Sequence, residues 1–105
     1  MKILFDQGVP APLRRAFSAH SVSTAYEIGW AELTNGALLK QADADFDILI
    51  TTDQGLRFQQ NLAGLHLTII VLPTTDWSVI RKHQEAIVAT AGAARPGEVV
   101  TLSWR

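Results

Sequence analysis

Short apolar segments alternate with amphipathic segments along the whole chain. Five segments rich in aliphatic and β-branched residues are typical of strands, and they lie at about residues 2–5, 21–25, 47–51, 67–72 and 98–102. Between them, apolar residues recur at helical spacing at about residues 10–20, 36–44, 54–61 and 77–91. The stretch from 26 to 34 has no clear period. The pattern therefore predicts strands and helices in strict alternation.

Most of the predicted strands are apolar at consecutive positions, which indicates burial on both faces, whereas residues 21–25 alternate with a period of two. Buried strands that alternate with helices favour a parallel sheet between two helical layers. We expect an α/β protein with three α/β/α layers and a mainly parallel sheet of about five strands. The first four strands are expected to be parallel, and the fifth is a candidate antiparallel edge. With 105 residues, the chain 1–105 is expected to form a single domain.

Charge and cysteine content exclude several classes of function. Nine basic and ten acidic residues give a net charge of -1, which removes the simplest argument for a nucleic-acid-binding domain. A nuclease remains compatible with this charge, because a metal site supplies its own positive charge. The chain has no cysteine, so disulfides, thiolate zinc sites and cysteine nucleophiles are excluded.

No segment has the pattern of a targeting signal or of a membrane span. The longest apolar run, residues 67–72, is far shorter than the roughly 18 residues that a transmembrane helix needs. The apolar run near the start, residues 3–5, is too short for the core of a signal peptide. We therefore expect a soluble, cytoplasmic protein that does not contact a membrane.

Three acidic residues follow predicted strands and are candidates for chemistry. Asp6 follows the first strand, Glu27 lies shortly after the second, and Asp53 follows the third. Ligands of parallel sheets bind beyond the carboxyl ends of the strands, so these side chains converge if the three strands are neighbours. Oxygen ligands suit Mg²⁺, and paired ions can activate water for phosphodiester cleavage. The sequence thus makes Asp6, Glu27 and Asp53 the candidates for an acidic metal site.

Each of these residues also has an ordinary structural explanation. Asp53 stands where the cap of the following helix is expected, and Asp6 is compatible with a simple turn. Glu27 is compatible with a solvated surface position, and Asn35 with a helix cap, as is its neighbour Thr34.

Polar residues beyond Asp53 are candidates for contact with a nucleic acid. Amide and guanidinium groups donate hydrogen bonds to phosphates and bases, although an exposed helix face explains the same residues. Trp30 and Trp77 can stack on bases, but the spacing of Trp77 with apolar neighbours favours a place in the core. The candidate substrate-binding residues are Asn35, Arg57, Gln59, Gln60 and Asn61.

Several segments together resemble the small PIN-like proteins of bacteria. The start of the chain, residues 1–6, followed by a proline-led helix with residues 13–15, is similar to the start of that family. The strand 48–53, Ile-Leu-Ile-Thr-Thr-Asp, is similar to its second signature. Residues 27–31, 34–36 and 58–62 resemble one branch of it, so the resemblance covers nearly the whole chain.

The resemblance implies a PIN-type fold and a ribonuclease that depends on Mg²⁺ or Mn²⁺. Many such proteins are toxins of toxin–antitoxin modules, as the VapC-type proteins are, so RNA and an antitoxin protein are the implied partners. Asp6 and Asp53 would be metal ligands, Glu27 a third acid, and Glu27 or Asn35 would orient a water. PIN-type toxins commonly dimerise, and Trp104 suits either a homodimer interface or packing on its own domain.

The chain departs from the family pattern at three positions. Relatives typically carry Asp-Glu after the first strand, where this chain has Asp6-Gln7. Their acidic stretch before the middle helix is replaced by residues 34–37, Thr-Asn-Gly-Ala, and a second aspartate is replaced by Gly55. Fewer carboxylates attract a divalent ion less strongly. An alternative function is therefore a PIN-like module of weak or no activity that binds a partner protein or RNA.

A phosphorelay receiver domain is a third reading, because receivers also place an aspartate after the third strand. Receivers need an acidic pair after the first strand and a lysine after the fifth. Here Gln7 follows Asp6, and Arg105 is the only cation after Glu98. We therefore disfavour this reading.

Overall fold

The chain forms an α/β fold with one parallel sheet. The computed structural model describes residues 1–104, apart from the side chains of Arg57 and Gln59. The elements, in chain order, are β1 (Lys2–Phe5), the 3₁₀ helix η1 (Ala11–Phe17), β2 (Ser21–Thr24), α1 (Asn35–Asp45), β3 (Ile48–Thr51), α2 (Leu56–Gln59), β4 (Thr68–Val71), α3 (Trp77–Ile80), the 3₁₀ helix η2 (Arg81–His83), α4 (Gln84–Ala93) and β5 (Val99–Thr101).

The strand order is β2-β1-β3-β4-β5, and every neighbouring pair is parallel. The predicted parallel α/β architecture is confirmed, and β5 is parallel rather than an antiparallel edge. In the register, Phe5 of β1 lies between Thr24 of β2 and Ile50 of β3. The first strand thus has the second and third strands as its two neighbours, and the direction of the strand order reverses between β1 and β3.

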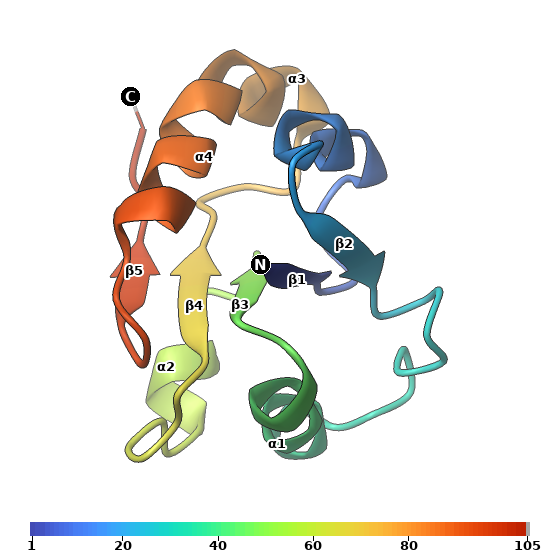
Figure 1. Ribbon diagram of the computed structural model, residues 1–105, viewed down its shortest axis with the longest axis vertical. Helices are drawn as coiled ribbons and strands as arrows, with labels where there is room; N and C mark the ends of the chain where they lie inside the picture. The colour runs from blue at the N-terminus through green and yellow to red at the C-terminus, as the bar shows by residue number, and fades with distance from the viewer. Residues whose placement is uncertain (105) are drawn as a thin grey trace.

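Alternate residues of the strands enter two separate cores. One face of the sheet carries the first cluster of buried residues, which helices η1, α3 and α4 complete: Ile3, Phe5, Leu13, Phe17, Ile48, Ile50, Ile70, Leu72, Ile80 and Ile87. The other face carries the second cluster, which α1 and α2 complete: Leu4, Leu38, Leu39, Ala42, Leu49, Leu56, Leu67, Ile69 and Val71. The sheet therefore lies between two helical layers (Figure 1).

The connection from β4 to β5 has an unusual path. It moves along the sheet in the same direction as the connections that contain α1 and α2, yet its helices α3 and α4 lie on the opposite face, with η1. The handedness of the β4–β5 crossover is therefore opposite to that of the other three crossovers. Crossovers between parallel strands are right-handed in nearly all proteins. As a consequence α4 packs against η1, as Figure 1 shows at the top of the molecule.

The helices begin largely where their caps predict. Thr34 caps α1 by accepting a 3.3 Å hydrogen bond from the N–H of Ala37, and Asp76 caps α3 by accepting one of 2.9 Å from that of Ser78. The helix predicted at 77–91 is interrupted by η2, because His83 has a non-helical backbone (φ -117°, ψ 15°). The helix predicted at 54–61 is reduced to the single turn of α2.

The end of the chain packs on its own domain. Trp104 contacts the first core cluster and stacks on His83, with 4.3 Å between the ring centroids. Trp77 also packs against this cluster, as its spacing predicts. Among residues 1–104, none of the helices is long and apolar enough to cross a membrane.

Candidate functional site at the carboxyl edge of the sheet

Two carboxylates lie where the order of the strands reverses. Asp6 follows β1 directly, and its N–H donates a 2.9 Å hydrogen bond to the carbonyl oxygen of Ile50 in β3. Asp53 follows β3 by two residues, so both side chains are at the carboxyl edge of adjacent strands. In open parallel sheets this reversal point opens a crevice where ligands bind. Both aspartates are half-buried.

The hydroxyl group of Thr51 links the two aspartates. Thr51 is fully buried as the last residue of β3. Its Oγ1 donates a 2.9 Å hydrogen bond to Oδ2 of Asp6 and accepts one of 3.1 Å from the N–H of Asp53. The rigid strand β3 thereby fixes the Asp6 carboxylate and the backbone of Asp53 in one arrangement.

The carboxylate of Asp53 is held by two further donors. Its Oδ1 accepts a 2.9 Å hydrogen bond from the N–H of Gly55, and its Oδ2 accepts one of 3.1 Å from the amide of Asn35. Gly55 occupies the cap position of α2, without a side-chain cap. The helix-cap explanation of Asp53 is therefore wrong, because its carboxylate instead stabilises the turn between β3 and α2.

Asn35 reaches the site from the first residue of α1. Thr34, not Asn35, is the cap of this helix, which leaves the Asn35 amide to bond Asp53. The side chain of Gln60 lies near the start of α1, because a Cβ atom built on Gly36 would be 3.3 Å from its Oε1. Of the candidate substrate-binding residues, Asn35 thus contacts Asp53 directly, and Gln60 lies near the start of α1.

The other candidates in that group have different positions. Asn61 is exposed, and its Oδ1 accepts a 3.1 Å hydrogen bond from the N–H of Ala63, so it supports a surface turn. The side chains of Arg57 and Gln59 lie outside the described residues.

The loop after β1 approaches the loop after β3 very closely. A Cβ atom built on Gly8 would lie 2.1 Å from Oγ1 of Thr52 and 3.5 Å from Cγ2 of Thr75. A glycine at position 8 therefore lets three loops converge at the carboxyl edge. This glycine is a functional candidate that sequence analysis missed, and its place two residues after Asp6 was the available signal.

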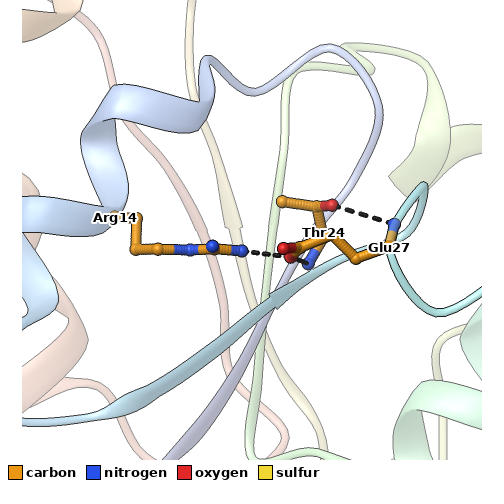
Figure 2. A network of polar contacts seen from close by, with 3 residues as sticks. All are labelled: Arg14, Thr24 and Glu27. Carbon is orange, nitrogen blue, oxygen red and sulfur yellow. Dashed lines mark hydrogen bonds and ion pairs between the residues drawn. The ribbon is translucent and has the colours of Figure 1, made fainter.

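Glu27 is paired with a cation rather than with the other acids. Oε1 of Glu27 accepts hydrogen bonds from Nη2 of Arg14 and from the N–H of Thr24, the latter at 2.9 Å (Figure 2). The N–H of Glu27 in turn donates to Oγ1 of Thr24 at 3.1 Å. The Arg14 guanidinium and then the Thr24 backbone lower the pKa of Glu27 below its ordinary value. Glu27 is therefore a charged partner of Arg14 near neutral pH, which sequence analysis did not foresee.

A groove of about 500 Å³ connects Glu27 to the aspartate site. Asp6 and Gln7 form one part of its lining, and Tyr26, Glu27 and Arg14 form another. The three predicted acids therefore share one edge of the sheet, but in two parts. Asp6 and Asp53 are joined through Thr51, whereas Glu27 lines the groove and is paired with Arg14.

The donor set fits a divalent cation that is largely hydrated. No group of three histidine, cysteine or acidic residues that could hold a metal is found among residues 1–104. Each oxygen of Asp6 and Asp53 takes part in one of the described hydrogen bonds, which leaves lone pairs for a cation. Mg²⁺ commonly binds through one or two carboxylates and keeps several waters. Asp6 and Asp53 are two carboxylates of this kind, at the ends of adjacent strands.

A second group of acids lies at the opposite, amino edge of the sheet, around a hollow of about 540 Å³. These acids hold the backbone in place. Asp43 accepts hydrogen bonds from the N–H groups of His66 and Leu67, at 2.8 and 2.9 Å, and Asp47 accepts one from Lys2 at 2.8 Å. Their role in the fold is structural.

Comparison of the chain with models of protein families, with curated proteins and with solved structures finds no match.

Proposed function

We propose that this protein is a metal-dependent endoribonuclease of the PIN type, with Asp6 and Asp53 at its centre. The observation that supports this most is the chain of hydrogen bonds from Asp6 through Thr51 to Asp53. It fixes the Asp6 carboxylate and the backbone of Asp53 at the reversal point of a parallel sheet, where such folds place their ligands. The fold and the position of the pair agree with the resemblance of the sequence to PIN-like proteins.

In this proposal Asp6 and Asp53 hold Mg²⁺ or Mn²⁺ through the oxygen lone pairs that their hydrogen bonds leave unused. When bound, such an ion supplies Lewis acidity toward a phosphodiester and activation of water. Thr51 keeps the Asp6 carboxylate oriented, and Asn35 does the same for Asp53. Glu27 faces the same groove as Asp6 and remains a candidate third acid for orienting water.

The test combines metal binding with cleavage of a single-stranded RNA. Calorimetric titration with Mn²⁺ should show binding to the wild-type protein, and Asp6→Asn and Asp53→Asn should each weaken it at least about tenfold. Cleavage of an end-labelled RNA should fall with both variants. Asp45→Asn is the matched control, since it removes one carboxylate from an exposed position at the opposite edge. Cleavage that survives both Asp6→Asn and Asp53→Asn would disprove the proposal.

A second candidate function is binding of RNA or a partner protein without cleavage. The observation that favours it is the pairing of Glu27 with Arg14, which leaves two carboxylates at the centre of the site. An intact RNA retained by the protein in the presence of Mn²⁺ would support this function over the first.

The resemblance further suggests the role of toxin in a two-component module. Induced expression of the wild-type chain in bacteria should then arrest growth, and Asp53→Asn should relieve the arrest at equal protein level. Co-expression with an antitoxin encoded beside it should also restore growth. Equal growth inhibition by the wild type and Asp53→Asn would contradict this role.

A further inference from the structure

One aromatic side chain at the site is almost entirely exposed. Tyr26 lies two residues beyond the end of β2, and 81% of its surface is accessible to solvent. Phe5 and Phe17 are buried, and Trp30 and Trp77 pack against the cores. Tyr26 instead lines the groove that contains Asp6. An exposed aromatic ring beside a phosphodiester site is the kind of surface on which unpaired bases stack.

Glu27 provides a hydrogen-bond acceptor in the same groove. Both of the described hydrogen bonds to its carboxylate end on Oε1, from Arg14 and from Thr24. Oε2 takes part in no hydrogen bond described among residues 1–104. The groove therefore combines an aromatic surface with a carboxylate oxygen that can accept from a ligand.

The charges of the groove favour a base over a phosphate group. Two carboxylates, those of Asp6 and Glu27, line it, and the guanidinium of Arg14 is engaged by Glu27. A phosphate in the groove would be repelled by Asp6. A neutral base meets no such repulsion, and the ion pair with Arg14 offsets the charge of Glu27.

On the proposed function as a basis, we propose that this groove binds one nucleobase of the RNA strand, stacked on Tyr26 and donating an exocyclic amino group to Oε2 of Glu27. Cytosine, adenine and guanine carry such an amino group. Uracil carries its single N–H donor between two carbonyl oxygens, which a carboxylate repels. The groove thus makes Tyr26 and Glu27 determinants of base specificity beside the cleavage site.

The chain offers a direct probe, because Tyr26 is its only tyrosine. Protein labelled with 3-fluorotyrosine gives a single ¹⁹F resonance that reports on the groove. Titration with CMP, AMP, GMP or UMP in EDTA should shift this resonance saturably, with UMP binding at least about fivefold more weakly than the others. Ribose 5-phosphate should produce no shift. A shift with ribose 5-phosphate equal to that with CMP, or no shift with any nucleotide, overturns the proposal.

Variants test the two contacts separately. Tyr26→Leu keeps an apolar side chain but removes the ring, and it should weaken binding of a short cytidine-rich RNA at least about fivefold in EDTA. Phe58→Leu is the matched control, because Phe58 is also largely exposed (77%) but does not line the groove. Glu27→Gln should reduce the preference for CMP over UMP, and a thermal melt checks that it still folds. Equal RNA affinity in the wild type and Tyr26→Leu overturns the proposal.

Failure of this inference and of the proposed function can be told apart. Nucleotide binding in EDTA without RNA cleavage in Mn²⁺ would support the groove and contradict the nuclease. Cleavage with unchanged base preference in Tyr26→Leu and Glu27→Gln would contradict the groove and support the nuclease.

Discussion

The hydroxyl group of Thr51 donates a 2.9 Å hydrogen bond to the carboxylate of Asp6, 45 positions away in the chain. The same oxygen accepts the N–H of Asp53, so one buried hydroxyl sets the relative positions of both aspartates. The geometry of the candidate site therefore depends on a residue that does not itself need to contact a ligand.

Replacement of Thr51 by valine should destabilise the protein and disturb the site. The change keeps the shape of the side chain but leaves Oδ2 of Asp6 and the N–H of Asp53 without this partner. We expect the free energy of unfolding to fall by about 1–3 kcal/mol, measured by urea denaturation. Thr51→Ser keeps the hydroxyl and should retain Mn²⁺ binding. A valine variant with wild-type stability and wild-type Mn²⁺ affinity would show that the bridge is unimportant.

An aspartate at position 35 should make stability depend on divalent cations. The Asn35 amide donates to Oδ2 of Asp53 at 3.1 Å, so Asn35→Asp places two carboxylates in contact. The repulsion between the two carboxylates should lower the melting temperature in EDTA at pH 7. Because a bound cation stabilises the folded state by mass action, Mg²⁺ should raise the melting temperature more than in the wild type.

Asn61→Asp is the control for that experiment. Its carboxylate can still accept the hydrogen bond from Ala63 in an exposed turn, and Asn61 makes no described hydrogen bond to Asp53. Melting of Asn61→Asp should respond to Mg²⁺ as the wild type does. An equal Mg²⁺ response in Asn35→Asp and the wild type would argue against a cation site beside Asp53.

Because Gly8 and Thr52 approach closely, the effects of Gly8→Ala and Thr52→Ala on the free energy of unfolding should not be additive. A Cβ atom at position 8 would lie 2.1 Å from Oγ1 of Thr52, so Gly8→Ala forces a shift that we expect to cost about 1–3 kcal/mol of stability. Thr52→Ala removes the obstructing oxygen. In a double-mutant cycle followed by urea denaturation, Gly8→Ala should cost at least about 0.5 kcal/mol less in the Thr52→Ala background. Simple additivity of the two changes would mean that the loops are farther apart.

The ion pair of Glu27 should give a pH-dependent contribution to stability. Arg14 is the main cause of the lowered pKa of Glu27 in the folded protein. A carboxyl group with a lowered folded-state pKa stabilises the fold above its unfolded-state pKa, and this contribution is lost as the pH falls through the folded-state value. The midpoint of the Glu27 carboxyl, followed by ¹³C NMR, should lie below 4.5 and rise toward 4.5 in Arg14→Met.

Arg15→Met separates this effect from a general change of charge, since Arg15 is an exposed neighbour in η1. In Arg15→Met, the titration midpoint of the Glu27 carboxyl should stay close to that of the wild type. The stability difference between Arg14→Met and the wild type should shrink as the pH falls from 7 to below the folded-state pKa of Glu27. A constant difference across that range would contradict the ion pair.

The local pattern of the sequence was enough to predict the parallel α/β architecture. Apolar strands such as residues 48–50, and caps such as Thr34 and Asp76, depend mainly on neighbours in the chain, which a sequence displays directly. The interruption at η2 and the path of the β4–β5 connection were not predictable in this way. Both involve the arrangement of segments that are distant in the chain, such as α4 and η1, which pack against each other.

The positions of Asp6 and Asp53 after buried strands can be read from the sequence, and they put both residues at the carboxyl edge if the strands are parallel. The pairing of β1 with β3, the link between the two aspartates through Thr51 and the ion pair of Glu27 with Arg14 are properties of the folded chain. The difference comes from the range of the forces involved. Burial and capping are set within a few residues, whereas hydrogen bonds and ion pairs between strands depend on a strand order that no local pattern encodes.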